Sequence, residues 1–288
     1  MSQAEQGGIS HAQRERLGTE LRRVRRLAGL AGRDMARQIG ASQAHVSRVE
    51  AGKAVPTLPQ VRAWAAAADV PEEARPALVA LTEAALNEFD SWQARDGAQL
   101  AAMQRDVGGL EAEAGVSRHF QPAIVPGLLQ TAEYARRVLA ITDIRGWGDH
   151  AAAVAARMER QQILYQPGRR FEFLLTEAAI RLRIGPPHVM RGQTARIRSA
   201  MSLENVDIGI VPLGEDAKVI PWCAFHLYDD LPDGQLPFVT MEIPHGRLTV
   251  SDPADVAVYA EQIEAIRQAA AHGTEAEGLL DLIDGSLS

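Results

Sequence analysis

The stretch GRDMARQIGASQAHVSRVEAGK, residues 32–53, predicts two short helices joined by a tight turn. The turn falls at Gly40, because helices often stop at a glycine with a left-handed backbone. Ser42 then suits the N-cap position, where its hydroxyl can accept a free amide hydrogen of the second helix. Within that helix Val46 and Val49 share one face. An apolar inner face and a small polar outer face are what a helix needs to lie in the major groove of DNA.

Eight residues in and beside these helices are predicted to contact DNA. In the second helix the Gln43 amide can make two hydrogen bonds to adenine, Ala44 can touch a thymine methyl group, and Arg48 can bind guanine or a phosphate. The remaining residues offer hydroxyls, an amide or a charge to the DNA backbone, which positions a protein without specifying sequence. The full set is Arg33, Gln38, Ser42, Gln43, Ala44, Ser47, Arg48 and Lys53.

Charge is divided unevenly along the 288 residues. Residues 1–70 carry 11 Lys+Arg against 6 Asp+Glu, whereas the rest of the chain carries 19 against 31. A basic N-terminal module therefore precedes an acidic body, which DNA phosphates would repel. A buried helical hairpin in a protein that binds no DNA is the alternative for residues 32–53, and the basic module favours DNA binding over it.

Composition and motifs argue against several classes of protein. No run approaches 18 apolar residues, and residues 1–10 do not resemble a signal peptide, so no membrane insertion is predicted. Cys223 is the single cysteine, which makes the reducing cytoplasm the simplest location. The sequence contains no GxSxG, phosphate-loop or HExxH motif and no Cys/His cluster at metal-ligand spacing. We therefore predict no enzyme, metal or cofactor, although a catalytic pair assembled only in space would escape this argument.

Hydrophobic spacing predicts further helices around the motif. Apolar residues at spacings of 4, 3 and 3 indicate a helix over 12–27 that faces inward through Leu17, Leu21, Val24 and Leu27. Its outer face carries Arg14, Arg16, Arg22, Arg23 and Arg26. Thr57 is the expected N-cap of a helix that buries Trp64. The polar residues 1–12 are predicted to form a disordered tail.

Residues 71–115 are predicted to be an almost wholly helical connector. Gly108 and Gly109 mark a break in it, because each glycine costs roughly 1 kcal/mol relative to alanine inside a helix. An apolar stripe consists of Leu100, Met103, Val107 and Leu110. This stripe is expected to pack on the C-terminal body, with a dimer seam as the alternative.

From residue 116 to residue 288 the pattern changes to mixed helix and strand. Strands are predicted at 171–176, 206–211, 225–228 and 238–243, with helices between them. The expected fold is an all-α N-terminal domain over 13–70, a helical connector over 71–115, and a C-terminal α+β domain with one mixed or mostly antiparallel sheet.

Four residues of the C-terminal domain form a candidate ligand pocket. Trp222, in a loop between strands, can line a pocket or close the core. Its neighbour Cys223 is a candidate for the same pocket. A redox-sensing role is the less favoured interpretation of this cysteine. Arg157 begins the segment RMERQ, where an anion site competes with a solvated or salt-bridged helix face. Tyr134 lies in PGLLQTAEYA, which is either a ligand loop or, as we favour, a structural connection.

The N-terminal residues resemble the phage-repressor-like helix-turn-helix domain of the Xre family. The matching residues are Leu21, Arg22, Arg25, Gly29, Ala36, Gly40, Val46, Ser47, Glu50, Gly52 and Pro56. The resemblance implies a five-helix DNA-binding domain and a structural pair between Arg25 and Glu50. The usual Leu-Thr-Gln is replaced by Leu30-Ala31-Gly32, which removes a typical phosphate contact that Arg33 is the candidate to replace.

Residues 116–288 resemble the DUF5753 domain. The resemblance rests on residues 120–135 and on RMERQ at 157–161, followed by Phe173, Thr176-Glu177 and Gly185. That domain is typically fused behind an Xre-type helix-turn-helix in actinobacterial regulators. A small DUF397 protein is often encoded beside such regulators, and the resemblance makes it a candidate partner. It does not settle the biochemical task of the DUF5753 domain.

Together these observations predict a sequence-specific transcriptional regulator that binds double-stranded DNA as a homodimer. Its C-terminal domain is expected to sense an unknown small-molecule effector or to bind a partner protein. The alternative is an antitoxin-like chain that pairs with a small neighbouring DUF397-type protein and autoregulates its own operon.

Overall fold

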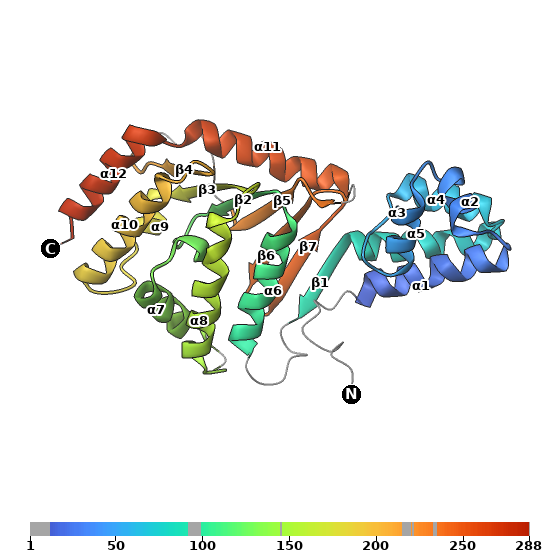
Figure 1. Cartoon of the computed structure of the whole chain (residues 1–288), viewed down its shortest axis with the longest axis horizontal. Coiled ribbons are helices and arrows are strands. Elements are labelled where there is room, and N and C mark those ends of the chain that lie inside the picture. Colours follow the sequence, from blue (N-terminus) through green and yellow to red (C-terminus); the bar gives the residue numbers. More distant parts are fainter. Residues whose placement is uncertain are drawn as a thin grey trace. The chain divides into compact units, whose positions relative to one another are not determined.

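The computed structural model describes residues 12–91, 99–144, 146–214, 220, 222–232 and 235–287 (Figure 1). The predicted disordered tail lies outside these residues, apart from Ala12. Internal contacts divide the chain into two compact units. The first comprises Met1–Trp92, Asp233–Phe238 and Ile243–Val256, and the second comprises Gln93–Pro232, Val239–Glu242 and Ala257–Ser288.

The described part of the first unit is mainly helical. It contains α1 (Ala12–Leu27), α2 (Gly32–Gln38), α3 (Gln43–Glu50), α4 (Leu58–Ala67), the 3-10 helix η1 (Glu72–Ala74), α5 (Arg75–Leu86), β1 (Asn87–Ser91) and β7 (Gly246–Val250). The two helices and the turn predicted from residues 32–53 are confirmed, and Gly40 has a φ of +67°. Both N-cap predictions also hold, since Ser42 Oγ accepts from the His45 amide at 3.1 Å and Thr57 Oγ1 from the Gln60 amide at 3.3 Å.

Strand β1 corrects the prediction that residues 71–115 are almost wholly helical. It pairs antiparallel with β7, with Phe89 opposite Leu248. Local spacing indicated a helix because the strand's hydrogen-bond partners lie far along the chain, where a sequence pattern cannot show them.

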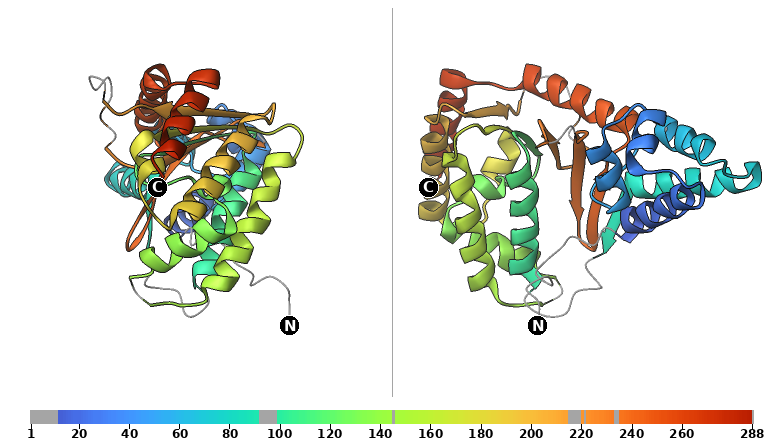
Figure 2. Two further views of the ribbon diagram at one scale, coloured as in Figure 1. Left: turned by 90° about the vertical axis from the view of Figure 1, so that its left-hand side faces the viewer. Right: turned by 45° about the vertical axis from the view of Figure 1, so that its right-hand side comes forward.

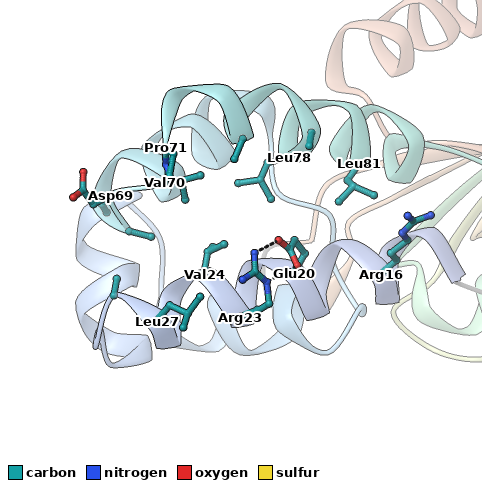
Figure 3. A pocket seen from close by; sticks show the side chains of 15 residues that line it. Arg16, Glu20, Arg23, Val24, Leu27, Asp69, Val70, Pro71, Leu78 and Leu81 are labelled. Atoms are coloured by element: carbon teal, nitrogen blue, oxygen red, sulfur yellow. Dashed lines mark hydrogen bonds and ion pairs between the residues drawn. The ribbon is translucent and has the colours of Figure 1, made fainter.

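The core of the first unit surrounds Trp64, which is wholly buried and donates its indole N–H to the Leu21 carbonyl at 3.2 Å. Leu17, Leu21 and Val24 face this core as predicted. Leu27 does not, because its side chain is 76% exposed. It lines an open groove of about 940 Å³ between α1 and α5, whose walls also include Leu78 and Leu81 (Figure 3). Among the described residues, no helix covers Leu27 at the end of α1.

The second unit is an α+β layer, as predicted. Its elements are α6 (Gln99–Glu113), β2 (Val116–Gln121), η3 (Gly127–Leu129), α7 (Ala132–Thr142), α8 (His150–Arg160), η4 (Gln161–Tyr165), β3 (Arg170–Thr176), α9 (Glu177–Arg181), α10 (Pro187–Met201), β4 (Val206–Val211), β5 (Phe225–Asp229) and α12 (Gly273–Gly285). Most of β6 (Phe238–Ile243) and α11 (Pro253–Ala269) also belongs to it. The strands predicted within this region are confirmed.

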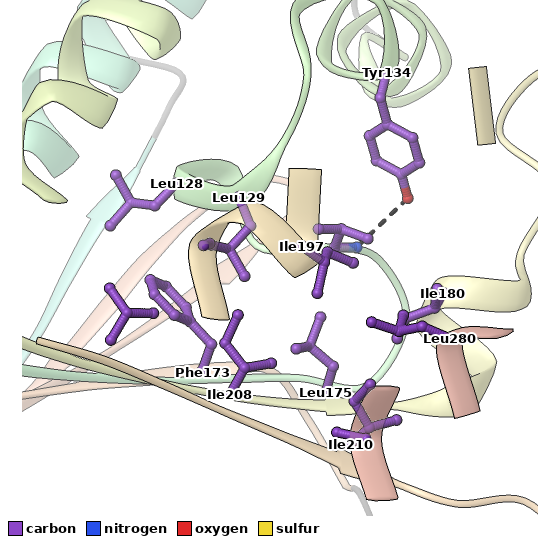
Figure 4. Packing of buried hydrophobic residues seen from close by; sticks show 14 of the residues in the cluster. Leu128, Leu129, Tyr134, Phe173, Leu175, Ile180, Ile197, Ile208, Ile210 and Leu280 are labelled. Atoms are coloured by element: carbon purple, nitrogen blue, oxygen red, sulfur yellow. Dashed lines mark hydrogen bonds between the residues drawn. The ribbon is translucent and has the colours of Figure 1, made fainter. Parts of the chain in front are cut away.

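The sheet of the second unit is mixed, with the strand order β6-β5-β2-β3-β4. Strands β2, β3 and β4 are parallel neighbours, whereas β5 runs antiparallel to β2. Helices α6, α7, α8 and α10 lie on one face of the sheet and α11 on the other (Figures 1 and 2). Over β3 and β4 the first face carries an apolar core that includes Phe173, Leu175, Ile208 and Ile210, packed against Leu129 (Figure 4).

Helix α6 is continuous across Gly108 and Gly109, so the predicted break is wrong. A Cβ added at Gly108 would lie 3.1 Å from Cγ of Arg160, so the bare backbone lets the side chain from α8 cross closely. The apolar stripe of α6 packs within the second unit, since Leu100 and Met103 join a cluster with residues of α7 and α8. For these two residues the structure therefore confirms packing on the C-terminal body and not the dimer-seam alternative.

Gly18 controls how closely α1 approaches α3. A Cβ at this position would overlap the Val49 carbonyl oxygen. We expect Gly18→Ala to lower the free energy of unfolding by about 1–3 kcal/mol, because overpacking outweighs the better helix propensity of alanine. Thermal or urea unfolding measures the change.

Gly32→Ala is the matched control, because a Cβ there would have its nearest neighbour at 3.9 Å. A Gly18→Ala protein as stable as Gly32→Ala would contradict the close packing of α1 on α3.

Candidate functional site

The outer face of α3 consists of short polar and apolar side chains. Gln43, Ala44 and Ser47 are exposed, whereas Val46 and Val49 on the opposite side are buried in the core of the first unit. This division follows from the helical period, which places residues three or four apart on one face. The exposed face has the size and hydrogen-bonding groups suited to base edges.

The other predicted DNA contacts lie on α2, on the turn and after α3. Arg33, Gln38, Ser42 and Lys53 are exposed, and Arg48 is half-buried. The Ser42 hydroxyl is already engaged as the N-cap of α3. The same hydroxyl would therefore have to serve both as the helix cap and as a phosphate contact.

His45 lies between the exposed and buried faces of α3. Burial lowers its pKa, the positive charge of Arg48 lowers it further, and a hydrogen bond with Gln60 opposes them. Since the ordinary histidine pKa is already below neutrality, His45 is uncharged at pH 7. The positive charge in this part of α3 therefore comes from Arg48.

A buried carboxylate fixes α3 against α1. Arg25 donates to the two Glu50 oxygens at 2.5 and 2.8 Å, and it also donates to the Leu30 carbonyl at 2.7 Å. Arg22 adds hydrogen bonds to the Glu50 carbonyl and carboxylate, at 2.7 and 3.3 Å. The Arg25–Glu50 pair is the one that the family resemblance implied. The sequence predicts Arg22 on the outer face of α1. It nevertheless binds Glu50, because the end of α3 lies close to it.

The four candidate pocket residues of the second unit have separate environments. Tyr134 is wholly buried in the apolar core, and burial raises its pKa to about 12. Trp222 is 79% exposed. Cys223 is also exposed, and partial burial raises the pKa of its thiol, which disfavours the reactive thiolate of a redox sensor. Arg157 is buried, so the expectation of a solvated face is wrong for it.

The segments PGLLQTAEYA, residues 126–135, and RMERQ, residues 157–161, meet in the second unit. Gln161 donates to the carbonyls of Gly127 and Gln130 at 2.8 and 2.7 Å, which pins the turn at η3. Arg157 donates to the amide oxygens of Gln130 at 2.5 Å and Gln104 at 2.9 Å. Gln104 and Gln130 were missed by sequence reasoning, because a glutamine carries no spacing signal for a buried arginine.

Glu111 and Arg160 form a second buried ion pair, with side-chain exposures of 1% and 9%. Glu111 Oε2 and Arg160 Nε are 3.2 Å apart, but their geometry makes no hydrogen bond, and neither carboxylate oxygen has another hydrogen-bond partner among the described residues. A buried polar group without a hydrogen bond typically costs about 1–3 kcal/mol. Burial raises the pKa of Glu111 to about 7, and the charges of Arg160 and Arg157 only partly oppose this.

Two family models match the chain. A helix-turn-helix domain matches residues 16–78, and a domain of unknown function, DUF5753, matches residues 104–281. No curated protein matches the chain. A helix-turn-helix domain is a DNA-binding module, so the chain is a DNA-binding transcription regulator.

The described residues contain neither a candidate membrane span nor a candidate metal site. No helix there is long and apolar enough to cross a membrane. In the same residues, no group of His, Cys, Asp and Glu side chains is arranged to hold a metal ion.

Arg25→Met leaves the Glu50 carboxylate buried with a weaker partner. We expect the free energy of unfolding to fall by about 3–5 kcal/mol, as for other broken buried pairs. Arg23→Met is the control, because its pair with Glu20 is exposed and contributes little. Chemical denaturation compares the two variants, and equal stabilities would contradict the structural role of Glu50.

The raised pKa of Glu111 predicts a pH-dependent stability. Between the unfolded value of 4.5 and the folded value of about 7, the folded chain holds a proton that the unfolded chain has lost. This contribution is therefore fully favourable below about pH 4.5, and about 3 kcal/mol of it is lost as pH rises from about 4.5 to about 7.

Glu111→Gln removes this titration, so its melting temperature should decline less than that of the wild type between about pH 5 and about pH 8. Glu113→Gln, an exposed change on the same helix, should keep the wild-type slope. If Glu111→Gln also kept that slope, Glu111 would not be the titrating group.

Proposed function

The chain belongs to the DUF5753 domain family, and we propose that it is a sequence-specific transcriptional regulator that reads DNA with α3. The main support for this proposal is that α3 has two faces of different character. One face is buried against the first unit's core, and the other exposes Gln43, Ala44 and Ser47.

In this proposal α3 enters the major groove with its N-terminal end toward the bases. Gln43 makes paired hydrogen bonds to an adenine, Ala44 contacts a thymine methyl group, and Arg48 binds guanine or a neighbouring phosphate. The phosphate contacts come from Arg33, Gln38, Ser42, Ser47 and Lys53. The ion pair of Arg25 with Glu50 contributes by holding α3 at a fixed rotation on α1.

The regulator is proposed to act as a homodimer in the cytoplasm. Two copies of α3 would read half-sites about one helical turn, or about 34–36 Å, apart on a two-fold operator. A small change in the separation of the two helices would then be enough to release DNA. The second unit is proposed to make that change as a non-enzymatic module, on binding an effector or a partner protein.

The rival proposal is an antitoxin-like chain that pairs with a small DUF397-type protein. Purification of the full chain from its native host separates the two. A stoichiometric small protein in the preparation favours the rival, whereas a bound metabolite favours the sensor.

Gln43→Ala combined with Arg48→Ala should abolish sequence-specific binding. Operator sequences are first selected from genomic fragments with the full chain, and affinities are then measured by fluorescence anisotropy. Gln43 is exposed, so the single variant Gln43→Ala should keep the wild-type melting temperature and still lose discrimination at one base pair, by about 1–3 kcal/mol. Arg62→Ala, an exposed change on α4, is the control for lost charge. Selective binding that survived the double substitution would mean that another face reads the bases.

Lys53→Ala should weaken binding to all sequences alike. It should also reduce the slope of log affinity against log salt by about one, because one phosphate contact is lost. Wild-type affinity that is insensitive to salt would contradict phosphate contacts by this unit.

A further inference from the structure

One face of the second unit's sheet is divided into an apolar half and a polar half. Alternate residues of a strand share a face, so Ser117, His119 and Gln121 of β2 lie together. The antiparallel register places Tyr228 opposite Ser117 and His226 opposite His119. The parallel register places Phe173 opposite His119, where the two rings stack at 4.9 Å. The apolar core thus ends at β3, and the polar half begins at β2.

Ser117, His119 and Tyr228 of the polar half are buried, and α6 and α8 lie over this face of the sheet (Figures 1 and 2). The positive charge of Arg160 contributes to lowering the pKa of His119, after burial and the neighbouring His226. Burial followed by the charge of Glu111 raises the pKa of Tyr228. The charged side chains of Arg160 on α8 and Glu111 on α6 therefore lie near these residues of β2 and β5. We call Glu111, Ser117, His119, Arg157, Arg160 and Tyr228 the polar cluster.

Several atoms of the polar cluster are buried without a hydrogen-bond partner among the described residues. They are both carboxylate oxygens of Glu111, Ser117 Oγ, His119 Nε2 and Arg160 Nε. Buried polar groups in native proteins are nearly always bonded to protein, water or a ligand. These five atoms come from α6, α8 and β2, and they include both hydrogen-bond donors and acceptors.

Two glycines set the position of the Arg160 side chain. A Cβ at Gly108 of α6 would lie 3.1 Å from its Cγ, and a Cβ at Gly127 would overlap its Nη2. The Arg160 side chain therefore passes Gly108 with its aliphatic part and reaches Gly127 with its guanidinium. The turn at Gly127 is itself held by Gln161. The two glycines thus help to fix the position of this cation within the polar cluster.

The buried charges of the polar cluster do not balance. Arg157 and Arg160 are both cations, and the pKa of Arg157, although lowered by burial to about 10, keeps it charged at neutral pH. Arg157 is held by the neutral amides of Gln104 and Gln130 rather than by a carboxylate. Glu111 is the one buried carboxylate in the cluster, and Glu242 nearby is exposed. Because the pKa of Glu111 is itself about 7, a negatively charged group would bring the cluster nearer to balance.

We propose that the polar cluster is the binding site for a small polar molecule that carries an oxyanion, either a carboxylate or a phosphate. The oxyanion would bind Arg160 and Arg157, as guanidinium groups favour paired hydrogen bonds to such oxygens. Glu111, Ser117 and His119 would bind the hydroxyl or amino groups of the same molecule. This site deepens the proposed function by placing the effector, and it rests on that function only for the link to DNA release.

The test measures anion binding to the full-length protein without DNA. Sodium acetate and sodium phosphate are titrated separately by calorimetry and thermal unfolding, against sodium chloride at matched ionic strength. We expect saturable binding of at least one anion with a rise in melting temperature, and the tighter of the two identifies the headgroup. Arg160→Gln should weaken this binding by about tenfold or more. Arg170→Gln, an exposed change on β3, should leave it unchanged.

A second variant keeps the test decisive if Arg160→Gln does not fold. Glu111→Gln retains both guanidinium groups and removes the competing carboxylate, so it should bind the anion more tightly than the wild type. The proposal is overturned if neither anion binds beyond the chloride background, or if both variants bind like the wild type.

The same measurements separate this site from the proposed function. If the anion binds but DNA affinity does not change, the binding site is supported and its link to regulation is contradicted. A full-length protein that binds the anion but no operator would keep the site and contradict the proposed function alone.

Discussion

The bonds around the Glu50 carboxylate determine the orientation of α3. Arg25 and Arg22 of α1 both bind this residue, which is buried at the end of α3. The apolar contacts of α3 with the core have little directional preference, whereas charge-assisted hydrogen bonds to arginine have a strong one. The pair therefore sets the rotation of α3, and that rotation decides that Gln43 and Ser47 face outward.

The second unit contains a buried ion pair of a different kind. Glu50 accepts well-formed hydrogen bonds on both oxygens, whereas Glu111 lies beside Arg160 without one. A buried charged side chain with all its hydrogen bonds is held rigidly. Any movement that breaks these bonds leaves the desolvation of the charge uncompensated. An incompletely bonded charge has a smaller barrier to rearrangement and more to gain from a new partner. The two pairs thus suit a fixed scaffold in the first unit and a responsive centre in the second.

Much of the fold and of the proposed DNA-binding face could be predicted from the sequence. The helix caps at Ser42 and Thr57, the turn at Gly40 and the apolar pair of α3 are encoded within a few residues of one another. The sequence likewise located β3, β4, β5 and β6, although not β2. Of the polar cluster, only Arg157 was named from the sequence, and its burial could not be predicted because it depends on glutamines from α6 and from the turn after β2.

The sequence by itself determined the two domain families, the local helices and the residues that α3 turns outward, since short-range periodicity and capping carry that information. Only the tertiary structure decided that β1 forms with β7, that Leu27 is exposed, and that Gly108 receives the Arg160 side chain instead of breaking α6. Each of these depends on groups brought together from distant parts of the chain. Long-range contacts therefore decide which buried charges meet, and with them where a ligand can bind.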